Sequence, residues 1–149
     1  GPGFTAGEDV DIVIETMRGH NLGRIIREGS AIPNTGIPGN IGGYAAERVI
    51  HAGEKGILYN VYKIGDIVEQ GEEIAYIMNE DENARYSVTA TIPGIIRGLI
   101  RDGYPVTKGF KIADIDPRES ELANCFTISD KASSIGGSVL EAVCRYVNG

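Results

Sequence analysis

The chain has 149 residues, a formal net charge of −7 and 23% charged residues, which suits one compact acidic domain with a small appendage. The acidic balance argues against nucleic-acid binding, because the phosphate backbone would repel the chain. No apolar run approaches the roughly 20 residues that a membrane-spanning helix needs, and the first residues lack the pattern of a secretory signal. Two cysteines do not make a disulfide framework in a chain of this length. We therefore expect a cytoplasmic protein that contacts no membrane.

The first part of the chain predicts two strands followed by a long loop. Residues 9–17 are crowded with β-branched side chains, and residues 24–26 follow them after a turn. Residues 29–43 then contain five glycines, two prolines and two asparagines, a density that excludes regular structure. This loop is either a lid or partner contact, or a linker between domains.

The middle of the chain contains one segment twice, 38 residues apart. Nine of 26 ungapped positions are identical between residues 52–77 and residues 90–115. The identical positions are mainly glycines at turns and aliphatic residues of the core: Ala52/Ala90, Gly56/Gly94, Ile57/Ile95, Gly65/Gly103, Val68/Val106, Gly71/Gly109, Ile74/Ile112, Ala75/Ala113 and Ile77/Ile115. Each copy predicts a strand, a short strand and a strand, joined by tight turns that need glycine.

The end of the chain predicts a helix from about residue 130 to residue 147, packed onto the repeats. Ser129 or Asp130 can cap it, and apolar residues follow at helical spacing. Gly136 and Gly137 each cost such a helix about 1 kcal/mol relative to alanine. Either another backbone or a ligand approaches closely at this pair, or the helix begins after it.

The repeated unit resembles the biotinyl/lipoyl carrier fold, in which two β-hammerhead halves pack face to face. The resemblance implies a mainly β protein, a barrel-sandwich hybrid of two hammerhead repeats with flanking N-terminal strands and a C-terminal helix. The expected segments are 1–48 (strands and loop, joining a further α/β domain), 49–116 (the two-repeat domain) and 117–149 (loop and helix). Carriers hold a modified lysine at the turn between the halves, but residues 78–88 contain no lysine. We therefore expect neither biotin nor lipoate.

Three longer segments resemble the C-terminal region of the selenium-dependent molybdenum hydroxylase maturation proteins. They are residues 1–24, residues 29–52, and residues 111–118 together with 125–143. The resemblance implies an accessory module that binds molybdenum cofactor or the hydroxylase and handles selenium or sulfur, with that hydroxylase and an N-terminal domain as partners. One departure is Gly136-Gly137-Ser138, where the family tends to have three glycines. The alternative is a structural or partner-binding domain whose chemistry resides in the N-terminal domain.

Within that resemblance, Cys125 is the candidate catalytic residue. A thiolate near a helix start, or near Lys131, would have a lowered pKa and would accept selenium or sulfur. The alternative is a small buried apolar side chain, the commonest role of a free cysteine. Cys144 lies at helical spacing with Leu140 and Val147, which favours packing.

The remaining candidates would bind the cofactor, and each has a structural alternative. Asp116 and Arg118 either clamp an anionic ligand or form an ion network that includes Asp114. The stretch from Ser129 through Asp130 to Lys131, with Gly136 and Gly137, either presents N–H groups and a lysine to the cofactor phosphate or merely caps the helix. Glu141 is either a site carboxylate or a solvent-facing residue. His20 and His51 have no companion at metal-ligand spacing, so no metal site is expected.

Overall fold

A computed structural model of the chain describes residues 1–35, 39–79 and 83–148. Two compact units emerge from the contacts between residues. The central unit contains residues 37–126, and the terminal unit contains residues 1–36 together with residues 127–149.

The compact units have different bounds from the three segments predicted from the sequence. The predicted first segment, 1–48, extends past the unit boundary at residue 36, and the predicted third segment begins before the boundary at residue 127. The C-terminal helix was expected to pack onto the repeats. It instead shares a unit with the N-terminal residues. The Gly/Pro-rich loop of residues 29–43 contains the boundary, and its residues 36–38 lie outside the described part of the chain.

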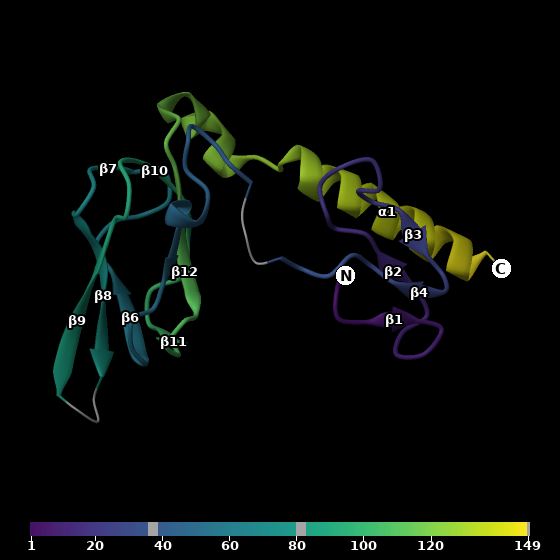
Figure 1. Ribbon diagram of the computed structural model, residues 1–149, viewed down its shortest axis with the longest axis horizontal. Helices are drawn as coiled ribbons and strands as arrows, with labels where there is room; N and C mark the ends of the chain where they lie inside the picture. Colours follow the sequence, from purple (N-terminus) through teal and green to yellow (C-terminus); the bar gives the residue numbers. More distant parts are fainter. Residues whose placement is uncertain (36–38, 80–82, 149) are drawn as a thin grey trace. The chain divides into compact units, whose positions relative to one another are not determined.

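Two four-stranded antiparallel sheets form the central unit (Figure 1). The first sheet has, in order, β5 (Val49–His51), β12 (Lys111–Asp116), β10 (Gly94–Leu99) and β7 (Ile67–Val68). The second has, in order, β11 (Tyr104–Val106), β6 (Gly56–Asn60), β8 (Glu73–Asn79) and β9 (Ala84–Thr89). A short helix, η1 (Ala46–Arg48), precedes β5, and η2 (Glu119–Phe126) follows β12. Alternate aliphatic side chains of both sheets make one buried cluster, in which Leu58, Ile77 and Ile115 are fully buried.

The two copies of the repeat exchange their short strands. In β7 of the first copy, Val68 pairs with Gly94 of the second, and in β11 of the second copy, Val106 pairs with Gly56 of the first. The same correspondence holds for turn hydrogen bonds, where Gly65 N–H donates to the Ile96 carbonyl at 2.8 Å and Gly103 N–H donates to the Leu58 carbonyl at 2.8 Å. In both pairs of contacts, each residue lies 38 positions from the equivalent residue in the other copy, which is the spacing of the repeat in the sequence. The repeat is therefore present in the backbone as well as in the sequence.

Gly56 and Gly94 occupy the tightest points of this arrangement. Their φ angles are 152° and 147°, a region that residues with a side chain rarely adopt. A Cβ atom at Gly56 would lie 2.3 Å from the Met78 carbonyl oxygen, and one at Gly94 would lie 2.4 Å from that of Asp116. Both obstacles are backbone atoms, which cannot rotate away. These two identities in the repeat are thus required by close backbone approach.

The predicted barrel-sandwich hybrid is wrong. Among the described residues no barrel closes, because the two four-stranded sheets end in β5 and β7, and in β11 and β9, which do not pair with one another. Two further ladders have only two strands each, and a long helix gives the chain a mixed rather than a mainly β content. The turn expected to join two halves instead connects β8 to β9, whose residues Asn79 and Ala84 pair. Residues 80–82 of that turn lie outside the described residues, so the absence of biotin and lipoate stays a prediction.

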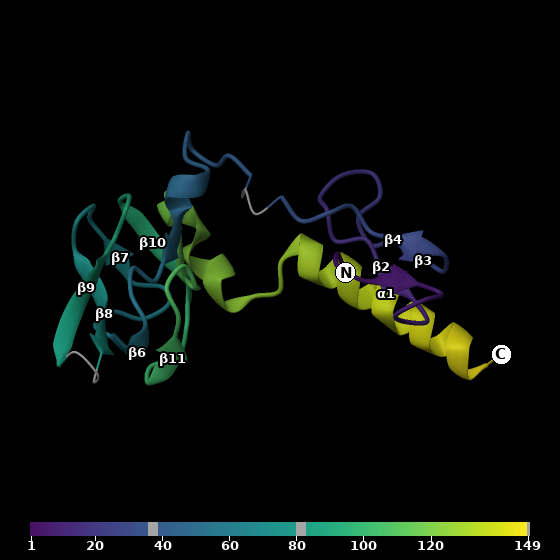
Figure 2. The same ribbon diagram turned by 60° about the horizontal axis from the view of Figure 1, so that its bottom comes forward.

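The terminal unit consists of two small ladders and one helix (Figure 2). Its elements are β1 (Thr5–Ala6) paired with β4 (Gly29–Ser30), β2 (Val13–Ile14) paired with β3 (Ile25–Ile26), and α1 (Asp130–Val147). The strand predicted over residues 9–17 is therefore much shorter. Among the described residues, α1 and the other helices are neither long nor apolar enough to cross a membrane.

Helix α1 starts where the sequence predicts. Ser129 is its N-cap, and the Ser129 hydroxyl oxygen accepts a hydrogen bond from the Ala132 N–H at 3.1 Å. The helix continues through Gly136 and Gly137, which excludes a start after this pair. The turn before β3 approaches the helix closely, since a Cβ at Gly23 would lie 2.7 Å from the Ser138 hydroxyl oxygen.

Replacing Gly56 or Gly94 with alanine should destabilise the central unit. Backbone strain alone should lower the free energy of unfolding by about 1–3 kcal/mol, and the collision with a carbonyl oxygen adds to that loss. Urea unfolding followed by circular dichroism measures the change. Gly98→Ala is the matched control in β10, because a Cβ at Gly98 would meet only the Asp114 Cβ at 3.6 Å. Equal unfolding midpoints for G94A and G98A would contradict the requirement.

Candidate functional site

The structure distributes the predicted site residues over both units. Cys125, Asp116 and Arg118 belong to the central unit. The others lie in the terminal unit, at the start of α1 or along it: Ser129, Asp130, Lys131, Gly136, Gly137 and Glu141.

Asp116 is a fully buried carboxylate at the end of β12. It accepts hydrogen bonds from Arg97 Nη1 at 2.9 Å, from Arg118 Nη2 at 2.8 Å and Nε at 3.0 Å, and from the Arg118 backbone N–H at 3.1 Å. The hydrogen bonds from Arg118 and Arg97 lower the pKa of Asp116 to about 2, although burial opposes this shift. Arg118 also lies 3.5 Å from Glu121. These contacts are those of a structural ion network, and the role of Asp116 and Arg118 as ligands stays a prediction.

Cys125 lies in η2 with its side chain partly buried. Its Sγ atom is 3.7 Å from the Glu121 carbonyl oxygen. Burial raises the pKa of the Cys125 thiol, and the nearby Arg97 only partly offsets this effect. A thiol that accepts selenium or sulfur needs the opposite shift. The thiol of Cys125 therefore lacks the lowered pKa that this role needs, and its catalytic role stays a prediction.

The start of α1 is capped by its own side chains. Besides the Ser129 cap, Asp130 accepts two hydrogen bonds from the Arg18 guanidinium, at 2.7 and 2.9 Å, which lower the pKa of the Asp130 carboxyl. A phosphate at this helix start would meet the Asp130 carboxylate, which favours the capping alternative over phosphate binding. Lys131 is partly buried, and Glu141 forms an ion pair with Arg145 at 2.7 Å. Gly136 and Gly137 are exposed.

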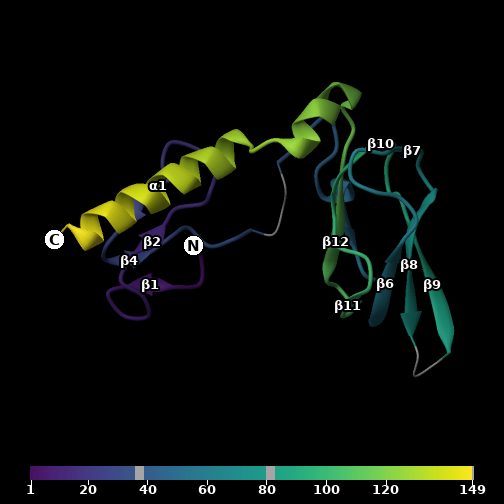
Figure 3. The same cartoon turned by 180° about the vertical axis from the view of Figure 1, so that it is seen from behind.

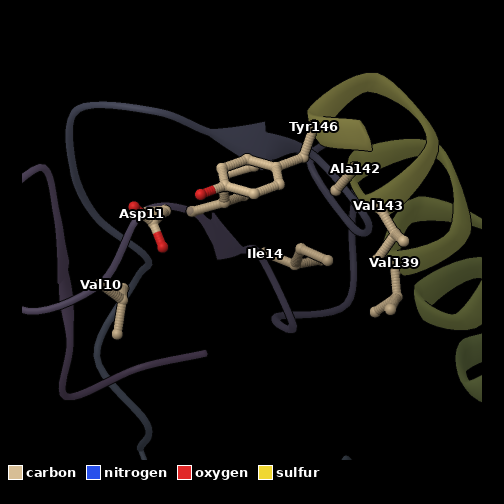
Figure 4. A pocket seen from close by; sticks show the side chains of 8 residues that line it. Val10, Asp11, Ile14, Val139, Ala142, Val143 and Tyr146 are labelled. Carbon is tan, nitrogen blue, oxygen red and sulfur yellow. The ribbon is translucent and has the colours of Figure 1, made fainter. Parts of the chain in front are cut away.

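The sequence analysis missed an apolar pocket in the terminal unit. The pocket has a volume of about 390 Å³ and lies between helix α1 and residues 10–14, which include β2 (Figure 4). Its lining is apolar except for one carboxylate and one phenol hydroxyl: Val10, Asp11, Ile12, Ile14, Val139, Ala142, Val143 and Tyr146. The signal in the sequence was the helical spacing of Val139, Ala142, Val143 and Tyr146, which we assigned to packing alone.

Much of the pocket lining remains in contact with solvent. Val139 is 46% exposed, Val143 is 53% exposed and Tyr146 is 69% exposed. The Tyr146 ring extends from α1 toward the side of the pocket that Val10 and Asp11 form (Figure 4). The pocket is consequently an open groove. Within residues 1–35, 39–79 and 83–148, no cluster of three or more histidine, cysteine or acidic residues could hold a metal ion.

Comparison with known proteins gives one relative and several partial structural likenesses. No family model matches the chain. The uncharacterized protein YqeB of Escherichia coli K12 is 50% identical over 148 residues, which are 99% of this chain and 26% of that protein. The chain thus spans about a quarter of the length of this relative.

The structural likenesses are weak. A succinylglutamate desuccinylase/aspartoacylase from Rhodobacter sphaeroides shares 21% identity with a TM-score of 0.44, over 49% of this chain and 23% of that one. An aspartoacylase family protein from Mesorhizobium loti shares 19% identity with a TM-score of 0.43, over 49% and 24%. The ectoine utilization protein EutE from Ruegeria pomeroyi shares 15% identity with a TM-score of 0.40, over 60% and 27%.

These comparisons overturn the predicted family and role. The relative is an uncharacterized protein, and the similar structures are aspartoacylase-type proteins or the ectoine utilization protein, not molybdenum hydroxylase maturation proteins. The prediction of an accessory role for a selenium-dependent molybdenum hydroxylase is therefore wrong. It rested on motifs rich in turn glycines, which backbone geometry can impose on chains of unrelated function.

Replacing Asp116 with asparagine should remove a pH-dependent contribution to stability. Because the pKa of Asp116 falls from 3.8 to about 2 on folding, the ionised carboxylate contributes about 2 kcal/mol above pH 4, and this contribution is lost as the pH falls through 2. At pH 7, D116N should therefore lower the free energy of unfolding by at least that amount. The difference in the free energy of unfolding between D116N and the wild type should shrink as the pH falls from 4 to 2.

Urea unfolding at a series of pH values measures this gap. Glu119→Gln removes an exposed carboxylate near the network and serves as the control, with little expected effect at any pH. A gap between wild type and D116N that stays constant from pH 7 to pH 2 would contradict the assignment.

Proposed function

We propose that this chain is a protein-binding module, in which the groove of the terminal unit receives apolar side chains of a partner segment that also carries a basic residue. The observation that carries this proposal is the groove of about 390 Å³ whose apolar lining stays exposed. Amphipathic helices are one class of partner that lays an apolar face into a hydrophobic groove of this kind.

The apolar side chains of the groove favour a polypeptide over a small molecule. Val139, Val143 and Tyr146 protrude from α1 with about half or more of their surfaces in water. An open site of this kind would cover little of the surface of a small ligand, whereas small-molecule pockets usually bury most of the ligand's surface. A helix that places apolar side chains at every third or fourth position would cover this surface along its length.

Asp11 gives the groove its charge preference. It is an exposed carboxylate at one side of an otherwise apolar lining, and the other polar atom contributed by a side chain is the Tyr146 hydroxyl. A lysine or arginine that flanks the apolar side chains of the partner would lie against this carboxylate. Complementary charge of this kind sets orientation and association rate more than affinity.

The extent of the relative supports a module within a larger assembly. The matched region occupies 26% of that protein, so the activity of the whole protein can reside in other parts of it. The described residues that line the groove offer a carboxylate and a phenol but no pair of nucleophile and base. Binding, rather than catalysis, is the chemistry that these side chains support.

Two synthetic peptides test the proposal on the 149-residue chain. Both carry leucines at positions i, i+3, i+4 and i+7, and one has flanking lysines where the other has glutamates. Fluorescence anisotropy should show the lysine peptide associating faster and binding a few times more tightly than the glutamate peptide. Asp11→Asn should reduce this charge preference, while Val139→Asp and Tyr146→Ser should each weaken binding of the lysine peptide at least tenfold.

The matched control lies on the same helix. Leu140→Asp introduces the same charge as Val139→Asp but outside the groove, and it should leave peptide affinity unchanged. Equal binding by V139D, Y146S and the wild type would refute the proposal. Self-association in sedimentation that V139D abolishes would also refute it, since the groove would then be an interface between copies of this chain.

A further inference from the structure

The repeat of the central unit extends further in the structure than in the sequence. Strand β5 pairs with β12, and β9 pairs with β8 in the same way. The first ladder shifts register between Lys111 and Ala113, and the second shifts between Glu73 and Ala75, which lie 38 positions earlier. Each strand of the first copy, from β5 to β8, thus has an equivalent in the second copy, from β9 to β12.

The two copies of the repeat are interlocked. In one sheet, β12 and β10 of the second copy lie between β5 and β7 of the first. In the other sheet, β6 and β8 of the first copy lie between β11 and β9 of the second (Figure 3). Each copy therefore supplies both edge strands of the sheet that the other copy centres. A copy without its counterpart would leave two sheet edges unpaired, which is a template for pairing with another chain.

Contacts between the copies occur as equivalent pairs. The Gly71 N–H donates to the Ala90 carbonyl at 2.8 Å, and the Gly109 N–H donates to the Ala52 carbonyl at 2.8 Å. Gly109 lies 38 positions after Gly71, and Ala90 lies 38 positions after Ala52. An interface in which the same surface appears on both sides is the interface of a twofold-symmetric dimer. The surface that joins the copies is therefore of a kind that two molecules can share.

A buried charge also crosses from one copy to the other. Arg48 directly precedes β5 and is 5% exposed, and its Nε donates to the Ile115 carbonyl of the second copy at 3.1 Å. Its Nη2 lies 3.7 Å from the Asp114 carboxylate of the second copy. A first copy that paired with nothing would lose these contacts. It needs a second copy, either from its own chain or from another molecule.

We propose that two molecules of this chain bind each other by exchange, so that the first copy of each pairs with the second copy of the other. The exchange keeps the strand pairings and hydrogen bonds between the copies and changes the connection alone. That connection runs from Asn79 to Ala84 and includes Asn83, whose φ is 50°. Among the described residues, Asn83 is the one non-glycine residue with a positive φ. Short connections under strain favour exchange between molecules, because opening releases the strain.

A disulfide distinguishes the closed chain from the exchanged dimer. His51 of the first copy and Lys111 of the second are exposed and lie opposite each other in β5 and β12, so cysteines at both positions can form a bond. H51C/K111C is made in the 149-residue chain with Cys125→Ser and Cys144→Ser, unfolded in urea and refolded at low and high protein concentration before oxidation. The closed chain forms this bond internally. The exchanged dimer forms it between molecules and remains a dimer on a denaturing gel without reductant.

At low concentration the disulfide should be internal, because the connection gives the two copies a high effective concentration. At high concentration the covalent dimer should appear. Asn83→Val should increase the exchange equilibrium constant by about tenfold, because a β-branched residue tolerates a positive φ poorly. Asn83→Gly should lower the dimer fraction, because glycine adopts this conformation without strain. Internal disulfides alone at every concentration, in N83V as well, would overturn the inference. Equal dimer fractions for N83V and N83G would also overturn it.

Two controls separate the exchanged dimer from other associations. H51C and K111C as single variants should give no covalent dimer, and a dimer of similar yield from either would overturn the inference by showing random contact between closed chains. Val139→Asp alters the groove of the terminal unit and should leave the dimer fraction unchanged. The exchange involves the central unit alone, so failure of the groove proposal does not affect this test. A dimer that V139D abolishes would assign the association to the groove instead.

Discussion

The central unit depends on two places where one strand touches the backbone of another without an intervening side chain. In the second copy of the repeat, Gly94 of β10 lies against the Asp116 carbonyl of β12. In the first copy, Gly56 of β6 lies against the Met78 carbonyl of β8. The contact at Gly94 fixes the end of β12 beside β10. The Asp116 carboxylate is thereby held in the interior next to Arg97 of β10, and Arg118 reaches it from two residues further on. The ion network is thus a consequence of the backbone contact.

The features that follow from local chemistry could be predicted from the sequence. The spacing of the repeat is correct because its glycines are needed wherever the backbone turns or touches. The extent of α1 is correct because a serine cap and a run of apolar residues at helical spacing define it. The pairing of Asp116 with Arg118 was predictable as an alternative, since the two residues are close in the chain. By contrast, the repeat does not predict whether the edge strands pair to close a barrel. These strands are β5, β7, β9 and β11. Closure depends on pairing between distant edge strands, which the alternation of apolar residues within each strand does not determine.

The functional prediction failed for a related reason. The segments that suggested a family contain several glycines whose φ angles are positive: Gly3, Gly7, Gly19, Gly23, Gly29, Gly42 and Gly43. Backbone conformation restricts these positions to glycine whatever the protein does, so they carry little information about chemistry. The pKa of the Cys125 thiol depends on burial. The groove lined by Val10 and Val143 likewise forms only when segments that are distant in the sequence meet. Helical spacing identifies an apolar face, but it does not show how much of that face stays exposed.

The stability of α1 bears on the proposed binding of a partner segment. Most helices in proteins depend on burial of an apolar face, yet Ala142 is the buried residue of this 18-residue helix. Local interactions add to its stability, through the Ser129 cap and through the exposed pairs of Arg18 with Asp130 and of Glu141 with Arg145. A helix that is already formed loses little conformational entropy when a partner covers it, so more of the apolar contact contributes to affinity. The exposed valines, leucine and tyrosine of α1 therefore form a preorganised surface. A segment that became helical only on binding would not present such a surface before it met its partner.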